Sequence, residues 1–352
     1  MARPYLAAVG LVVVAQTYAW ADNPAQDVTR SPTAPLPGYL KKLEGSTAEL
    51  STYVGSGTFY VSGYRNPYVS IALFLRPNYD LGTRYKLALR ARIYVEQELT
   101  QPDNPTGRPF YPYDPWVWLA ADNIHTFEHS KVRIGGMVRT IIPVSYESRY
   151  QHSLFGIGTG PSVNRDFELG QVNDEARKWT LKLTYAFTAY KYFQSSDFRG
   201  SGPGDTTGCM APPSAGAPGA SGGTGLTAAA SDRCGGPANA NFSFSNFFIA
   251  NVAHGKWSFG MTLLIQNTFN HSIPTDMFTP QNGVNTGRTD NTWGILSLGY
   301  QLRPHFGLSA GISSLQPALD SQYRYPRFPF WDLSGGNYNN YSQVFIGVNG
   351  TI

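Results

Sequence analysis

The chain has 352 residues with 27 Lys and Arg against 23 Asp and Glu, so charged residues make up only 14% of it, where an average soluble domain has about 25%. Aromatic residues reach the same 14%, and no apolar run approaches the roughly 18 residues of a membrane-spanning helix. The net charge of +4 is too small over this length to predict nucleic-acid binding. These features exclude a helical membrane protein and are typical of a transmembrane β-barrel, whose strands show only alternate residues to lipid.

The first residues predict export. Arg3 precedes an apolar run from Leu6 to Ala15, and Ala19-Trp20-Ala21 supplies a small-x-small cleavage site, the three regions of a secretory signal peptide. We therefore expect residues 1–21 to be removed. Residues 22–47 contain four prolines and are expected to form a periplasmic segment, or one that enters the barrel.

Both cysteines, Cys209 and Cys234, lie in a stretch rich in Gly, Ala, Ser and Pro at residues 195–240. A pair of cysteines in an exported protein usually forms a disulfide, which here would stabilise a long extracellular loop by about 3 kcal/mol. Their spacing does not match that of a zinc site, so no metal is predicted.

Residues 86–98 give the clearest strand signal. Apolar residues occupy the odd positions from Leu87 to Val95, while Lys86, Arg90, Arg92, Glu96 and Glu98 all occupy even positions. A strand places such residues on opposite faces, whereas a helix would scatter them. Residues 178–187 and 257–266 alternate in the same way. A tilted strand needs roughly 9 to 11 residues to cross a membrane, and these runs match that length.

The connections between the predicted strands alternate in length. Tight links at 80–83, 128–131, 171–177, 254–256 and 303–305 alternate with longer polar links, of which 195–240 is the longest. Outer-membrane barrels separate short periplasmic turns from extracellular loops in this way. We count about 12 strands, within a range of 10 to 14, and predict an all-β, antiparallel, up-and-down barrel over residues 48–352.

With a signal sequence, alternating strands, unequal connections and a closing strand near Val344, Ile346 and Val348, the chain resembles the Gram-negative outer-membrane β-barrels. The resemblance covers nearly the whole mature chain and implies a location in the bacterial outer membrane, contact with its lipid, and a monomer or homo-oligomer such as a trimer. One departure is the last residue, Ile352, where such barrels often end in an aromatic residue.

The predicted interior faces carry more cations than acids. The residues assigned there are Arg76, Lys86, Arg90, Arg92, Arg133, Arg139, Lys178 and Lys182 against Glu96, Glu98 and Asp122. Charges of one sign between low-dielectric walls favour counter-ions, which predicts a channel for small solutes with a weak preference for anions. The alternative is that these charges pair within the lumen and that Lys86, Arg133 and Lys178 ring the periplasmic mouth.

Three other functions remain open. Trp116, Trp118, Phe74 and Met137 could line a path for hydrophobic molecules, and the 195–240 loop could serve a structural or adhesive barrel. A membrane-embedded hydrolase is disfavoured, because the adjacent pairs His152-Ser153 and His271-Ser272 would point to opposite faces of a strand. We therefore predict no catalytic residues and no cofactor. Gly156, Gly158 and Gly160 are expected to relieve crowding in a curved wall.

Overall fold

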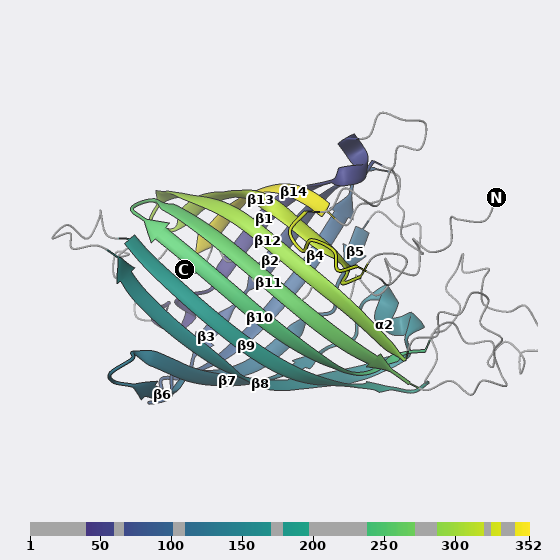
Figure 1. Cartoon of the computed structure of the whole chain (residues 1–352), viewed down its shortest axis with the longest axis horizontal. Coiled ribbons are helices and arrows are strands. Elements are labelled where there is room, and N and C mark those ends of the chain that lie inside the picture. Colours follow the sequence, from purple (N-terminus) through teal and green to yellow (C-terminus); the bar gives the residue numbers. More distant parts are fainter. Residues whose placement is uncertain are drawn as a thin grey trace, which may run out of the picture.

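The computed structural model describes residues 40–59, 67–100, 110–169, 179–196, 238–271, 287–319, 325–331 and 342–352. These residues form one antiparallel sheet that closes on itself as a barrel (Figure 1). Its elements, in chain order, are η2 (Lys41–Leu43), β1 (Thr47–Gly55), η3 (Ser56–Phe59), β2 (Val69–Arg76), β3 (Asn78–Asp80), β4 (Leu87–Glu98), β5 (Phe110–Pro112), β6 (Trp116–Phe127), β7 (Val132–Ile141), α2 (Tyr146–Tyr150), β8 (Ser153–Leu169), β9 (Trp179–Gln194), β10 (Ala240–His254), β11 (Trp257–Asn270), β12 (Arg288–Arg303), β13 (Phe306–Pro317) and β14 (Ser342–Thr351).

The fourteen strand segments form twelve strands of the barrel wall, because two of these strands are each made of two segments. Pro77 separates β2 from β3, and both segments pair with β4; β5 and β6 likewise pair with successive parts of β4. The ring closes where β1 pairs with both β2 and β14. The predicted antiparallel, up-and-down barrel of about 12 strands is therefore confirmed.

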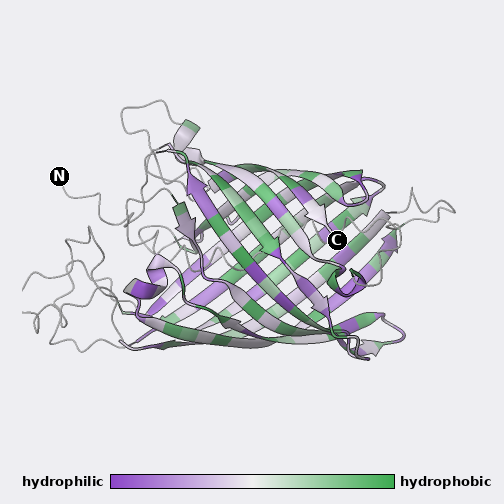
Figure 2. Cartoon of the chain, turned by 180° about the vertical axis from the view of Figure 1, so that it is seen from behind, coloured by the Kyte–Doolittle hydropathy of each residue, from purple (hydrophilic) through white to green (hydrophobic). Residues whose placement is uncertain are grey.

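Side chains alternate between the two faces of the wall, as the sequence pattern predicts. Leu89 and Ile93 of β4 are exposed on the outside, while Arg92, Tyr94 and Glu96 are buried in the interior. The outward positions of the other strands are also apolar, and Figure 2 shows the two kinds of residue alternating along the strands. Large exposed apolar residues include Leu50, Ile71, Leu119, Val138, Ile157, Leu183, Phe248, Phe259, Leu298, Leu308 and Ile346. An apolar outer surface around a polar interior is the arrangement of the outer-membrane β-barrels.

The barrel has two unlike ends. At the turn end, short links at 81–86, 128–131, 255–256 and 304–305 join neighbouring strands, and Thr47 of β1 pairs with Thr351 of β14. At the loop end, residues 142–152 form a longer link that contains α2. The turn end is at the left of Figure 1 and α2 is at the right. Residues 1–39, 170–178 and 197–237 lie outside the described residues, so the signal peptide, most of the periplasmic segment and the cysteine pair stay predictions.

Residues 325–331 pack on the outer face of the wall near the loop end. Gln316 of β13 donates a hydrogen bond to the carbonyl oxygen of Phe328 at 2.5 Å. Gly294 of β12 leaves room for this segment, because a Cβ there would overlap the backbone at Pro329. The segment thus covers a polar part of the outward face.

In the described part of the chain, no helix is long and apolar enough to cross a membrane.

Candidate channel lumen

Glu49 and Arg76 form an ion pair on the inner face of β1 and β2 near the turn end. Their closest nitrogen and oxygen atoms are 3.8 Å apart, and the Glu49 side chain is 1% exposed. Ser51 also donates a hydrogen bond to Glu49 at 2.6 Å. A buried carboxylate is costly unless it is paired and hydrogen-bonded. Arg76 and Ser51 together offset the cost of burying the Glu49 carboxylate.

Glu96 is the centre of a tyrosine cluster on the same wall. Its carboxylate accepts hydrogen bonds from the hydroxyl groups of Tyr94 at 2.8 Å, Tyr113 at 2.9 Å and Tyr68. The rings of Tyr94 and Tyr113 stack with their centroids 4.3 Å apart. Glu98, one pleat nearer the loop end, accepts a hydrogen bond from Thr100 at 3.1 Å.

Arg92 lies between these two groups. It is 3% exposed, and its guanidinium carbon is 5.3 Å from the ring centroid of Phe74 and 5.9 Å from that of Tyr94. Phe74 stacks in turn on Tyr94. The weakly hydrated guanidinium plane suits such aromatic surroundings better than an ammonium group would.

Two further arginines have acidic partners toward the turn end. Arg90 forms a salt bridge with Asp122 of β6 and donates a hydrogen bond to Asn78 at 2.8 Å. Arg133 of β7 pairs with Asp166 of β8 at 2.6 Å. Both pairs are partly exposed, so each stabilises the barrel by at most about 1 kcal/mol.

The other predicted cations lie at different depths. Lys86 is exposed in the link that precedes β4, not on the lumen wall, and Lys182 of β9 lies opposite Asp166 of β8 in the strand register. Lys178 is outside the described residues. The sequence-derived set is therefore spread along the barrel and does not form one ring.

Arg139 lies in an aromatic recess on the adjoining wall. Its guanidinium carbon is 4.4 Å from the ring centroid of Trp116 and 5.5 Å from that of Tyr190. Tyr190 comes from β9, two strands beyond β7, and crosses β8 at Gly156 and Gly158. A Cβ at Gly156 would be 2.6 Å from the Tyr190 ring, and one at Gly158 would overlap it. Gly156 and Gly158 are predicted to relieve crowding in the wall, and in the structure they do so by making room for the ring of Tyr190.

The opposite wall, from β10 to β14, is lined with uncharged residues. The buried inward side chains there include Ser243, Ser245, Asn251, Ser258, Thr262, Gln266, Asn291, Ser297, Ser309, Gln343 and Asn349. The interior also contains a buried cluster of apolar side chains from several strands. Its members are Trp116, Tyr190, Tyr192, Ala240, Phe247, Leu264, Trp293, Ile295, Leu315 and Phe345. A solute inside the barrel would therefore meet charged groups on one side only.

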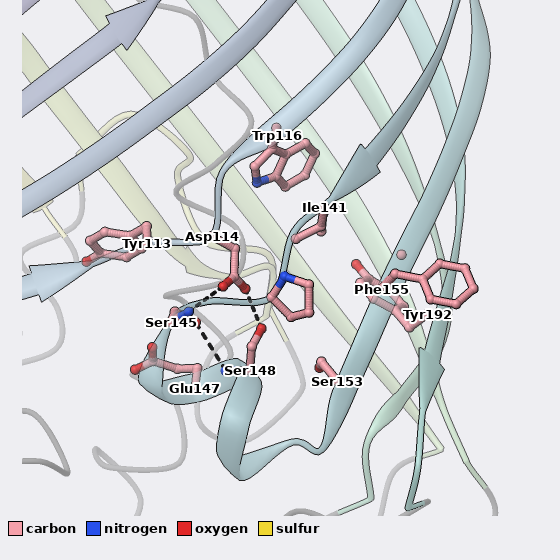
Figure 3. Close-up of a pocket in the computed structure, with 12 residues that line it drawn as sticks. Tyr113, Asp114, Trp116, Ile141, Ser145, Glu147, Ser148, Ser153, Phe155 and Tyr192 are labelled. Atoms are coloured by element: carbon pink, nitrogen blue, oxygen red, sulfur yellow. Dashed lines mark hydrogen bonds between the residues drawn. The ribbon is translucent and has the colours of Figure 1, made fainter.

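A small cavity lies at the loop end, between α2 and the inner wall (Figure 3). Trp116, Gly156 and Tyr192 of the barrel wall line one side of it, and Glu147 and Ser148 of the α2 loop line the other. Burial raises the pKa of the Glu147 carboxyl from 4.5 to about 7.

Sequence reasoning missed three parts of this site. Glu49 shares the inward face of β1 with Ser51 and Tyr53, and Asp166 that of β8 with Asn164, so alternation could have located both acids. Tyr94 shares the inward face of β4 with Glu96, so alternation places them together, whereas Tyr68 and Tyr113 come from other segments that nothing in the sequence pairs with Glu96. Trp116 and Phe74 are buried in the interior, as the alternative hypothesis of an apolar path required.

Comparison with known proteins yields likenesses of fold alone. No family model and no curated protein matches the chain. The outer membrane channel COG4313 from Pseudomonas putida F1 superposes with a TM-score of 0.47 at 10% identity, over 91% of this chain and 100% of that one. Outer membrane phospholipase A from Escherichia coli gives 0.30 at 12% identity, over 88% and 92%. A porin gives 0.30 at 10% identity, over 87% and 99%.

Proposed function

We propose that this chain is an outer-membrane channel through which small solutes diffuse passively, with a weak preference for anions. The observation that carries the proposal is the unequal lumen, in which arginines line the wall formed by β2, β4 and β7 while β10 to β14 present neutral polar groups. Guanidinium groups attract anions, and a neutral wall opposite them does not offset that attraction.

The pairing of charges limits this preference. Arg76, Arg90 and Arg133 each have a carboxylate partner, so the field that a passing ion meets is smaller than the number of arginines implies.

Uptake of hydrophobic molecules is a second candidate, favoured by the buried apolar cluster that includes Trp116, Phe247, Trp293 and Phe345. A hydrophobic solute would gain free energy by contact with this surface, at about 25 cal/mol per Å² removed from water. The predicted partners are accordingly outer-membrane lipid and small solutes, without a cofactor or an enzymatic step.

Liposome swelling tests the proposal. Vesicles that contain the purified barrel should swell in isosmotic solutions of a small neutral sugar and of a small carboxylate, and somewhat faster with the carboxylate than with an ammonium compound of equal size. Swelling with none of them, together with binding of an apolar fluorescent probe, would favour hydrophobic uptake. If the vesicles do not swell and the probe does not bind, the hypothesis of a structural or adhesive barrel remains.

A further inference from the structure

We propose that the link at residues 142–152 is a latch over the loop end of the lumen, which Asp114 holds closed and which ionisation of Glu147 releases. The inference rests on the proposed channel function, because a latch matters only if solutes pass beneath it.

Asp114 ties this link to the barrel wall. It lies between β5 and β6, and its carboxylate accepts hydrogen bonds from the backbone N–H groups of Val144 at 2.8 Å and Ser145 at 2.6 Å and from the hydroxyl group of Ser148. These three contacts join segments about 30 residues apart in the chain. One side chain thereby fixes the whole N-terminal half of the link (Figure 3).

The link is also fastened at its other side. Asn239, which precedes β10, donates hydrogen bonds to the carbonyl oxygens of Gln151 and Ser196, both at 2.8 Å. Within the link, Ser145 caps α2 by accepting a hydrogen bond from the N–H of Ser148 at 3.1 Å. The link is thus held at two places, by Asp114 at Val144 and Ser145 and by Asn239 at Gln151.

The underside of the link faces the lumen. The cavity beneath it is lined by Trp116, Gly156 and Tyr192, which belong to the inward faces of β6, β8 and β9. An outward movement of α2 would open this cavity to the lumen and widen the loop-end mouth.

Glu147 is the element that makes the closed position sensitive to pH. It is 7% exposed and lines the cavity, and burial affects the pKa of its carboxyl more than the hydrogen bond from its own backbone N–H does. The other titratable groups around the cavity are Tyr113, Asp114 and Tyr192, none of them a cation. Arg149 and His152 of the same link are exposed. Arg139 lies against the ring of Trp116.

The direction of the response follows from linkage. Burial raises the pKa of Glu147 to about 7 in the closed position, and in the released position the carboxyl would regain its ordinary value. A group whose pKa is raised in one state stabilises that state at low pH and loses the effect as the pH rises through the raised value. The open-to-closed ratio should rise about tenfold per pH unit between 4.5 and 7 and stay constant above that range.

Two measurements on the full chain test the latch. In planar bilayers, open probability should increase with pH between 4.5 and 7, and E147Q should stay closed and unresponsive over that range. E128Q, which removes an exposed carboxylate in a turn at the other end, should behave like the unmodified protein. D114N should open the channel at every pH, because it weakens the hydrogen bonds at Val144 and Ser145.

Hydrogen exchange gives a readout that does not depend on conduction. After correction for intrinsic rates, amides of residues 142–152 should exchange faster as the pH rises, while those of β7 should not, and E147Q should abolish the difference. A response that persists unchanged in E147Q, or its absence from the unmodified protein, would overturn the latch. Lack of conductance at every pH in all variants would instead refute the channel, and hydrogen exchange would still decide whether the link moves.

Discussion

Tyr190 lies so close to Gly158 that a methyl group on the glycine would overlap its ring. The contact matters because Tyr190 also packs against Trp116, with ring centroids 5.8 Å apart, and helps to surround Arg139. A backbone position on β8 thus fixes the place of a cation on β7.

Gly158→Ala should therefore destabilise the barrel. Adding a methyl group to a well-packed interior typically costs about 1 to 3 kcal/mol, and the free energy of unfolding in urea, with the protein in lipid vesicles, measures it. The matched control is Gly287→Ala, because a Cβ at Gly287 meets no atom within 4 Å. Equal stabilities for the two variants would contradict the close packing of Tyr190.

Charge selectivity should respond in opposite directions to the two halves of one ion pair. Arg90→Gln leaves Asp122 without its partner and should shift the reversal potential toward cations, whereas Asp122→Asn should shift it toward anions. Both shifts should shrink in 1 M salt, where the Debye length is about 3 Å. Arg288→Gln removes an exposed pair with Asp290 and should change little. Unchanged potentials at low salt in both lumen variants would show that this pair lies off the permeation path.

The hydroxyl groups around Glu96 should each contribute to stability. Tyr94→Phe and Tyr113→Phe remove one hydrogen bond to a buried carboxylate and should each lower the free energy of unfolding by about 1.5 to 3 kcal/mol. Tyr79→Phe, at a residue 40% exposed, serves as the control and should stay within about 0.5 kcal/mol of the parent. An effect no larger than the control's would mean that these hydrogen bonds are replaceable by water.

Orientation in the membrane is testable by labelling. In a background with both native cysteines replaced by serine, Ser195→Cys at the loop end should react with a membrane-impermeant maleimide on intact cells, and Glu128→Cys at the turn end should react only after lysis. The opposite result would place the loop end on the periplasmic side.

The predicted disulfide can be examined in the native chain. Mass spectrometry without reductant should find Cys209 joined to Cys234, and replacement of both by serine should leave the barrel folded, since both belong to one long loop. Two free thiols in freshly isolated protein would contradict the pairing.

The wall of the barrel was predictable from the sequence because lipid imposes a simple rule on each strand. Residues 86–98 put apolar and charged groups on opposite faces, and the structure keeps that division, with Leu89 outside and Arg92 inside. The same rule works less well for β1, where Thr, Ala and Ser weaken the contrast and Glu49 escapes notice.

Pairing of charges between strands was not predictable, because it depends on the register of neighbouring strands. Arg90 meets Asp122 only because β4 pairs with β6 in the observed alignment. The α2 link was also beyond reach of the sequence, since five residues are too few to show a helical period. Its position depends on Asp114, a residue from another loop.

The seam between β1 and β14 has a consequence for how the barrel is made. Thr47 pairs with Thr351, so the last contacts to form join positions about 300 residues apart, and such long-range pairing slows folding. Until the final strand arrives, β1 and β13 each present an open row of backbone donors and acceptors, which are sites for pairing with other chains. A chain cut before Ser342 should therefore aggregate during biogenesis, even though it keeps eleven of the twelve barrel strands.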